Sequence, residues 1–364
     1  MLHVRPFRTN GLTVRLSASG FVVAAFLVAD PVTLRFAPAP ESSVERSAVW
    51  IERTQTEDVA LLIDGEPTDQ VPTVSTELER ELTIESVETF VSAIDGRLVE
   101  LVRAFGPITM EASSEIEASL PGAGDASFEI GGEGGSELEG VRVRFVWDPD
   151  LEEWTKSFAD DYEGREELLE PLEPTTELLF ALPEDEDVEV DDRWDLDLDV
   201  LFDLLRPGGA VPLDVETDLQ ALEGVLDPIL LPGVFDSLDG DREGDVSARV
   251  TSADDSRAVI AIAVDAKVTC DHLEGGTIDL EDALPEGARA DLARATYETS
   301  IDGKGEIVWD LEAGRMASFR FEADVEVEIQ LDVDVEAEGE DLFAELREQR
   351  EGTVEVRIES AEGR

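Results

Sequence analysis

The chain has little positive charge. Of its 364 residues, 28 are Lys or Arg and 88 are Asp or Glu, which gives a formal net charge of -60. Because contacts to phosphate need a basic surface, this balance excludes nucleic acid as a partner and argues against binding to an anionic membrane surface. A surface so rich in carboxylates is typical of a protein that stays soluble in a salty medium, where its self-repulsion is screened.

Cysteine and histidine are also scarce. Cys270 is the single cysteine, so the chain cannot form an internal disulfide, and it lies far from the N-terminus, where a lipid anchor would be. With two histidines in all, metal sites that need several His and Cys ligands cannot be built. Cys270 and His272 are two residues apart on one expected strand, about 7 Å from each other along it. Residues placed in this way seldom form a nucleophile and base pair, so we interpret Cys270 as a small buried residue beside an ordinary histidine.

The apolar run near the N-terminus is short. Gly20–Ala29 (GFVVAAFLVA) follows Arg5, Arg8 and Arg15 and is too short to span a bilayer as a helix. This order of charge and then apolar residues is typical of a signal peptide, and it predicts an exported protein with a leader over residues 1–39. The alternative is a buried first strand. The cleavage point stays open, because Pro40 follows the Ala-x-Ala of residues 37–39 and hinders cleavage there.

Apolar and polar residues alternate with a period of two through most of the chain. Examples are Ser47–Gln55, Val141–Trp147, Ala258–Val268 and Gly305–Leu311. Such strands bury one face and expose the other, as in antiparallel sheets. We therefore predict a mainly β fold of long curved antiparallel sheets, half-barrel or open-barrel like, with a few short helices.

Turns and helices are predicted at fewer places. Turn sequences occur at residues 93–98, 147–154, 300–305 and 311–316, and Thr73–Ile94 is interpreted as a strand. The Gly-rich stretch 122–140 is interpreted as a flexible loop. Short helices are predicted at residues 165–172, 197–205, 216–226, 286–296 and 340–350.

An irregular stretch divides the chain. Pro and Gly are frequent over residues 207–244, which we interpret as a linker or insertion between a β-rich half at 40–206 and a second β-rich half at 245–364.

One acidic segment is a candidate metal site. The sequence DSLDGDREGD, residues 236–245, places four acids at alternate positions: Asp239, Asp241, Glu243 and Asp245. An oxygen-rich loop with glycines suits calcium, although the segment departs from the EF-hand pattern. The other interpretation is a solvated acidic loop. A calcium-stabilised module would melt at a higher temperature in calcium than in chelator.

Two further chemistries have weaker support. Among 88 acids, many pairs fall by chance within the separation that a glycoside hydrolase needs, so spacing alone does not identify a carboxylate-dependent hydrolase. The five tryptophans lie within or beside alternating runs, which favours core packing or hairpin pairing over a sugar-stacking surface. They are Trp50, Trp147, Trp154, Trp194 and Trp309.

The stretch EADVEVEIQLDVDVEA, residues 322–337, is the most regular alternation in the chain. Carboxylates about 7 Å apart on one face repel each other by roughly 0.6 kcal/mol in water before screening, so this row needs no bound ion. The opposite face is continuously apolar, and it predicts half of a core wall whose register is fixed by burial.

One segment resembles a known group of proteins. Leu182 and Pro183 are followed by Val188, Val190, Asp192 and Trp194. This spacing is similar to a Leu-Pro and V-x-V-G-D-x-W segment of uncharacterised secreted β-rich bacterial proteins, with Asp191 in place of the usual glycine. The resemblance implies an exported all-β scaffold and supplies no catalytic residue.

The sequence therefore predicts a non-enzymatic binding or interaction protein, exported to the periplasm, cell surface or extracellular space. A curled sheet can enclose a cavity, so the predicted partner is an apolar small molecule or an envelope protein. No cofactor is predicted, apart from calcium if the acidic segment at residues 236–245 binds it. The alternatives are the calcium-stabilised module and the carboxylate-dependent hydrolase.

Overall fold

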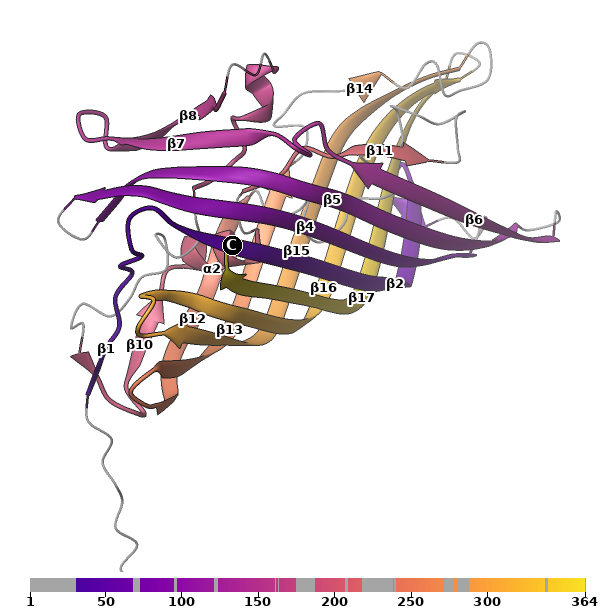
Figure 1. Ribbon diagram of the computed structural model, residues 1–364. Helices are drawn as coiled ribbons and strands as arrows, with labels where there is room; N and C mark the ends of the chain where they lie inside the picture. Colours follow the sequence, from indigo (N-terminus) through magenta and orange to yellow (C-terminus); the bar gives the residue numbers. More distant parts are fainter. Residues whose placement is uncertain are drawn as a thin grey trace, which may run out of the picture.

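The computed structural model describes residues 31–67, 73–94, 97–120, 124–160, 162, 164–174, 187–206, 209–217, 238, 240–271, 278–279, 288–337 and 340–363 (Figure 1). These residues are almost all in antiparallel strands, which confirms the predicted fold class. The long strands are β2 (Ser42–Ile63), β4 (Thr73–Ile94), β5 (Arg97–Leu120), β6 (Gly124–Gly135), β12 (Asp241–Ala253), β13 (Arg257–Asp271), β15 (Ala288–Asp310), β16 (Arg315–Ala337) and β17 (Glu340–Glu362). The short elements are β1 (Val32–Thr33), β3 (Glu66–Pro67), β7 (Arg142–Asp148), β8 (Glu153–Phe158), η1 (Glu166–Leu168), β9 (Asp187–Val188), β10 (Arg193–Leu196), α2 (Leu198–Leu205), β11 (Asp214–Thr217) and β14 (Ile278–Asp279).

One 15-stranded sheet contains nearly all of these strands. Its main path runs β10-β12-β13-β15-β16-β17-β2-β4-β5-β6-β11, and the hairpin of β7 and β8 branches from β5. The C-terminal strand β17 pairs with β2 along 19 positions, so the two β-rich halves of the sequence share one sheet. The sheet curves strongly without closing. In Figure 1, β2, β4 and β5 therefore cross in front of β13, β15 and β16.

Strand β16 shows why the sequence folds in this way. From Glu322 to Glu328 every acid is exposed and every apolar residue is buried, as the alternation predicts. Each buried residue pairs with a neighbour on both sides; Val325, for example, lies opposite Ile301 of β15 and Gly352 of β17. A shift of one residue would bury the acids, so burial fixes the register.

Three of the four predicted turns are present and one is wrong. Hairpins join β4 to β5, β7 to β8 and β15 to β16. The predicted turn at residues 300–305 instead lies inside β15, where Gly303 packs beneath Phe321. A Cβ atom at Gly303 would lie 2.5 Å from the ring of Phe321, so this glycine allows a close approach of side chains.

The helical predictions are partly wrong. Helix α2 confirms the prediction at residues 197–205, and η1 falls within 165–172. Residues 288–296 and 340–350 are strand, because the continuous ladders of β15 and β17 with β16 outweigh a helical spacing of apolar residues. The Gly-rich stretch also contains a strand, β6, which pairs with β5 from Met110 to Leu120.

The inner face of the sheet is covered by segments of the same chain. Apolar residues of η1 and α2 join those of the long strands in one hydrophobic core. Figure 1 shows α2 within the curve of the sheet. The most deeply buried large residues come from both the sheet and these segments: Trp309, Tyr297, Phe90, Phe145, Phe202, Phe319, Leu101, Leu172 and Leu201.

The N-terminal segment packs against the same core. Leu34 is fully buried, and the ring of Phe36 lies 5.9 Å from that of Phe90. The amide of Ala37 donates a 2.9 Å hydrogen bond to the carbonyl oxygen of Gly314. The expected leader of residues 1–39 therefore includes a segment that is part of the folded body, whereas residues 1–30 lie outside the described part.

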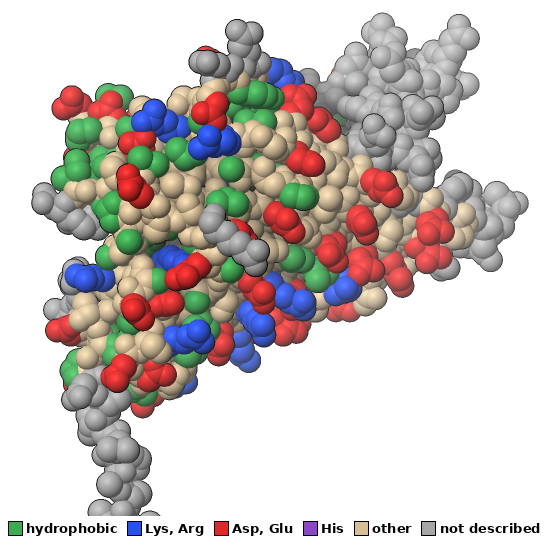
Figure 2. Space-filling model, in the orientation of Figure 1, with side chains coloured by type: hydrophobic (Ala, Val, Ile, Leu, Met, Phe, Trp, Pro, Cys, Tyr) green, Lys and Arg blue, Asp and Glu red, His purple; other side chains and the backbone are tan. Residues whose placement is uncertain are grey.

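The outer face of the sheet carries the charge. Figure 2 shows acidic side chains, mixed with Lys and Arg side chains, spread over the exposed surface. Among the described residues, no helix is long and apolar enough to cross a membrane.

Candidate functional site

A pocket lies on the inner face of the sheet, between strands β2 and β4 and the segment that follows α2. Its volume is about 210 Å³. One wall is formed by the two strands and the other by the end of α2 with residues 209–213. The lining residues are Trp50, Glu52, Arg80, Leu82, Ile84, Leu205, Arg206, Gly209, Ala210, Val211 and Leu213.

The register between β2 and β4 determines which side chains lie next to each other on the strand wall of the pocket. Glu52 lies directly opposite Arg80, and one row further along Trp50 lies opposite Leu82. Ile84 occupies the next row in the same direction. Since residues i, i+2 and i+4 of a strand share a face, the wall changes from charged to apolar along the strand.

Helix α2 is held over the wall by its own local signals. The side chain of Asp197 caps its first turn by accepting a 3.0 Å hydrogen bond from the amide of Asp199. Leu201 and Leu204 are buried against the core. At its end, the indole nitrogen of Trp50 donates a hydrogen bond to the carbonyl oxygen of Leu205.

Gly209 brings the chain back over the pocket. Its φ of +90° is favourable for glycine, and a Cβ atom there would lie 2.1 Å from the carbonyl oxygen of Pro171. Gly209 forms an isolated bridge with Leu172, and the amide of Ala210 donates a 3.1 Å hydrogen bond to Pro171. The second wall of the pocket is therefore anchored to the segment after η1.

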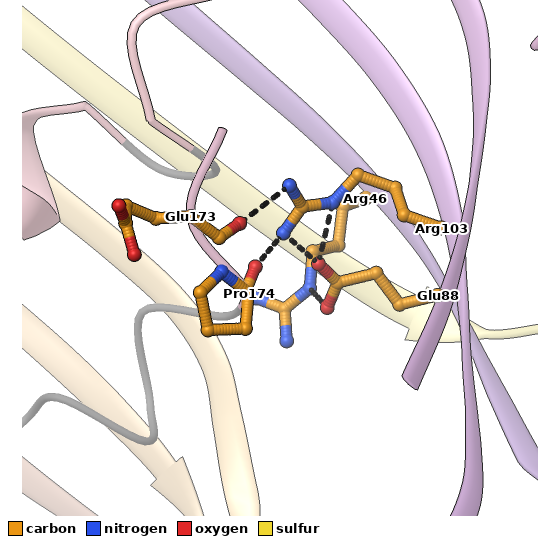
Figure 3. A network of polar contacts seen from close by, with 5 residues as sticks. All are labelled: Arg46, Glu88, Arg103, Glu173 and Pro174. Atoms are coloured by element: carbon orange, nitrogen blue, oxygen red, sulfur yellow. Dashed lines mark hydrogen bonds and ion pairs between the residues drawn. The ribbon is translucent and has the colours of Figure 1, made fainter. Parts of the chain in front are cut away.

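A second polar cluster lies further along the same inner face (Figure 3). The Nε atom of Arg46 donates to Glu88 Oε2 at 2.8 Å, and Arg103 Nη2 donates to Glu88 Oε1 at 2.6 Å. Arg103 also donates to the carbonyl oxygens of Glu173, at 2.9 Å, and Pro174. All three charged side chains of the ion triad, Arg46, Glu88 and Arg103, are almost completely buried.

Two opposing effects act on the pKa of Glu88. Burial raises it, whereas the charges of Arg46 and Arg103 and their hydrogen bonds lower it. The net result is a pKa below the ordinary value for Glu, so Glu88 is ionised at neutral pH.

The ion triad is best explained by anchoring. The guanidinium group of Arg103 lies 5.7 Å from the ring centroid of Phe105 and 5.3 Å from that of Phe145. Its remaining donors reach the backbone of Glu173 and Pro174, on the segment that covers the sheet. Arg103 thus connects this covering segment to β5, and its donors are used within the protein.

A larger hollow of about 660 Å³ lies on the exposed face. It crosses β16, β17, β2, β4, β5 and β6, and exposed polar side chains flank it, mostly carboxylates such as Glu77, Glu115 and Glu326. A ligand site normally has an apolar wall with a few converging polar groups. The smaller inner pocket has that composition, and the outer hollow is a solvated acidic surface.

The predicted calcium residues do not form a loop as far as they are described. Asp241, Glu243 and Asp245 are exposed and lie on β12, while Asp239 is outside the described residues. Glu243 lies opposite Lys267 of β13. In the described part of the chain, no three His, Cys, Asp or Glu side chains come together to hold a metal ion. The calcium site stays a prediction, which melting curves in chelator and in calcium would test.

The cysteine and the tryptophans of the chain have structural positions. Cys270 is buried near the end of β13, and His272 is outside the described residues. Trp50 and Trp309 are buried in the core. Trp147 and Trp154 pair across the β7 and β8 hairpin with ring centroids 5.8 Å apart, and Trp194 packs against the core.

Sequence reasoning missed the charged residues of the inner face, although a signal for them exists. Arg46 and Glu52 occupy the apolar phase of β2, in step with Val44, Ala48 and Trp50. A charged residue at a strand position where the alternation predicts a buried apolar residue indicates a buried ion pair or a polar pocket. The sequence gives no such signal for Arg206, because this residue follows helix α2 and lies outside any alternating strand.

Comparison with known proteins identifies no family. No protein-family model matches the chain, and no curated protein matches it in sequence. Among solved structures, an outer membrane channel from Pseudomonas putida F1 is similar with a TM-score of 0.22 and 9% identity, over 89% of this chain and 97% of that one. A Pseudomonas aeruginosa FadL homologue is similar with a TM-score of 0.24 and 8% identity, over 92% and 99%. Both TM-scores are too low to assign this chain a fold family or a function.

Proposed function

We propose that this protein is an exported, non-enzymatic β scaffold of the cell envelope or extracellular space that binds a small apolar molecule on the inner face of its sheet. The pocket between β2, β4 and the segment after α2 carries the proposal. Trp50, Ile84 and Leu205 give it buried apolar walls. The leader pattern before residue 30 supports export, and the acidic exposed face suits an aqueous, salty compartment.

The size of the pocket limits its ligand. Ligand sites commonly have volumes of about 300 to 1,000 Å³. At about 210 Å³, this pocket is smaller, because η1, α2 and residues 209–213 fill much of the inner face. A short chain or a single ring fits this space, and a long lipid chain does not fit entirely.

Binding of a neutral apolar dye tests this function. 4-(Dimethylamino)benzonitrile, a single-ring dye whose emission depends on the polarity of its surroundings, should change its emission when it binds the purified protein, and mass spectrometry of organic extracts should detect a co-purified small molecule. Val211, which lines the pocket and is half-buried, is the position for a blocking variant. Val211→Trp should abolish dye binding by filling the pocket.

The control places the same change elsewhere. Val259 is half-buried on β13 and lies on the face opposite to Ala258 and Ile260, which are in the core. Val259→Trp should leave dye binding unchanged. Equal dye binding by the wild-type protein and Val211→Trp, with both folded by circular dichroism, would contradict the proposal.

A further inference from the structure

The size of the pocket depends on the position of its second wall. Gly209 and Ala210 of this wall are joined to the chain that follows η1. Gly209 forms a bridge with Leu172, and the amide of Ala210 donates a hydrogen bond to the carbonyl oxygen of Pro171. We call residues 170–174 the strap. Because the wall is bonded to the strap, a shift of the strap would move the wall and change the space between the wall and the strands.

Two basic side chains hold the strap. Arg103 donates hydrogen bonds to the carbonyl oxygens of Glu173, at 2.9 Å, and Pro174. The Nζ atom of Lys156 donates to the carbonyl oxygen of Glu170 at 2.7 Å. The side chain of Arg103 is 4% accessible and that of Lys156 is 19% accessible. Since hydrogen bonds from charged donors are stronger where water is excluded, Arg103 is the stronger anchor.

The shape of the guanidinium group suits this role (Figure 3). Its Nε and Nη2 atoms donate to Glu88 Oε1 at 3.0 and 2.6 Å, while Nη1 and Nη2 donate to the two carbonyl oxygens of the strap. The planar group therefore lies between β4 and the strap and is bonded to both. A lysine has a single nitrogen, so it could pair with Glu88 but could not reproduce this set of contacts.

We infer that Arg103 is a positioning residue of the pocket: it limits the size of the ligand by fixing the strap and, through the strap, the wall at Gly209 and Ala210. This inference rests on the proposed function, because it concerns the same pocket. Leu169 and Leu172 are buried, so the strap should stay attached to the core when Arg103 is replaced. Loss of the anchor should then widen the pocket.

Two dyes of different size test the inference. The single-ring dye fits a space of about 210 Å³, whereas Nile red, which has four fused rings, does not. The wild-type protein should therefore bind the single-ring dye and exclude Nile red. Arg103→Lys keeps a positive charge beside Glu88 and loses the contacts to the strap. It should bind Nile red at least about tenfold more tightly than the wild-type protein does, the change expected when one hydrogen bond to a charged group is lost.

Gly209→Ala tests the same contact from the side of the wall. A Cβ atom at Gly209 would lie 2.9 Å from the Cα atom of Leu172 and closer still to the carbonyl oxygen of Pro171. The wall and the strap would have to move apart, so this variant should also bind Nile red. Adding Val211→Trp to either variant should abolish Nile red binding, which would place the dye in the pocket.

Leu331→Ala is the control for a general loss of stability. Leu331 is 6% exposed and lies on β16. Ala323 of the same strand belongs to the row that reaches the pocket at Glu52, and Leu331 is about 26 Å further along the strand, at about 3.3 Å per residue. Leu331→Ala should lower the melting temperature and still exclude Nile red.

The outcomes separate the two claims. If folded Arg103→Lys excludes Nile red and binds the single-ring dye like the wild-type protein, Arg103 does not limit the size of the ligand and the pocket remains a binding site. Binding of Nile red by Leu331→Ala as tight as that by Arg103→Lys would also overturn the inference, because the change would follow stability alone. If the wild-type protein and all variants bind neither dye, the proposed function itself is wrong.

Discussion

The indole nitrogen of Trp50 donates a hydrogen bond to the carbonyl oxygen of Leu205, 155 residues later in the chain. This contact connects the central strand β2 to the end of α2, at the junction of the two pocket walls. Trp50→Phe should lower the free energy of unfolding by about 1 to 3 kcal/mol, because a buried carbonyl loses its donor and the smaller ring leaves space. Urea unfolding would measure the loss, and the affinity for the single-ring dye should fall with it.

Trp147 provides the control for this change. It is half-buried and pairs with Trp154 in the β7 and β8 hairpin, away from the pocket. Trp147→Phe should leave dye affinity unchanged. A Trp50→Phe variant that binds the dye like the wild-type protein would show that the contact does not shape the pocket.

The buried ion triad gives a second prediction. Removing the carboxylate with Glu88→Gln leaves Arg46 and Arg103 buried without their shared anion. The loss should be large, about 3 to 5 kcal/mol at neutral pH. The control is Glu79→Gln, which breaks the pair with Arg53 on the exposed face, where both side chains are more than half accessible. That change should cost less than about 1 kcal/mol in urea unfolding.

The effect of Glu88 should depend on pH in a defined direction. Its pKa in the folded state lies below the ordinary value, so its ionised form contributes stability above the unfolded-state pKa. This contribution is lost as the pH falls through the folded-state pKa. The difference in melting temperature between the wild-type protein and Glu88→Gln should therefore be largest near neutral pH and decrease in acid. A difference that is constant with pH would mean that Glu88 is not ionised in the fold.

A third prediction concerns the glycine inside β15. At Gly303 a Cβ atom would lie 2.5 Å from the ring of Phe321 and 2.8 Å from the Cβ atom of Ala323. Gly303→Ala should destabilise the protein by about 1 to 3 kcal/mol through overpacking. In the background Phe321→Leu the same change should cost less, because the ring is gone. Additive losses in this double-mutant cycle would contradict the close approach.

The strands could be predicted from the sequence where alternation and burial agree. Residues 322–337 have one apolar and one acidic phase, so a single register satisfies burial, and the structure has it. The order of strands could not be predicted in this way. The pairing of β17 with β2 joins segments about 300 residues apart, and no local pattern specifies it.

The wrong predictions have a common physical cause. The Asp-Gly of residues 302–303 is a strong turn signal alone, but inside β15 the glycine serves side-chain packing against β16. Residues 340–350 have apolar spacing that suits a helix, yet long ladders on both sides stabilise a strand. The strand wall of the pocket could have been predicted from the sequence, because Glu52 and Arg80 are charged residues at positions where the alternation of β2 and β4 otherwise places apolar residues. Arg206 and Gly209 enter it only through the tertiary path of the chain after α2.

A fourth prediction concerns export. Leu34 is fully buried and Val32 pairs with Val188, so cleavage at residue 39 would remove part of the core. We expect the mature N-terminus upstream of Val32 when the chain is secreted with its leader. N-terminal sequencing of the secreted protein would establish the position. A mature chain that begins at Pro40 and is equally stable would contradict the packing of this segment.

The last prediction concerns the crowded carboxylates of the outer face. A hydrogen bond to Glu351, the negative charge of Glu351 and that of Glu326 raise the pKa of Glu57, which is fully exposed. The folded state raises this pKa, so ionisation of Glu57 opposes folding. The protein therefore loses stability as the pH rises from the unfolded-state pKa of Glu57 through its folded-state pKa. Glu351→Gln removes one of the charges while its amide oxygen can still accept the hydrogen bond that Gln55 now donates to Glu351.

The variant should therefore have a lower pKa at Glu57, measured by NMR titration, and a higher melting temperature at neutral pH in low salt. The gain should disappear in molar salt, where the Debye length is about 3 Å. The control is Glu355→Gln on the same strand. Glu355 accepts a 2.6 Å hydrogen bond from Arg357, so its loss removes an attractive contact and should not raise the melting temperature. Equal shifts for both variants would mean that net charge alone, and not the local crowding at Glu57, controls stability.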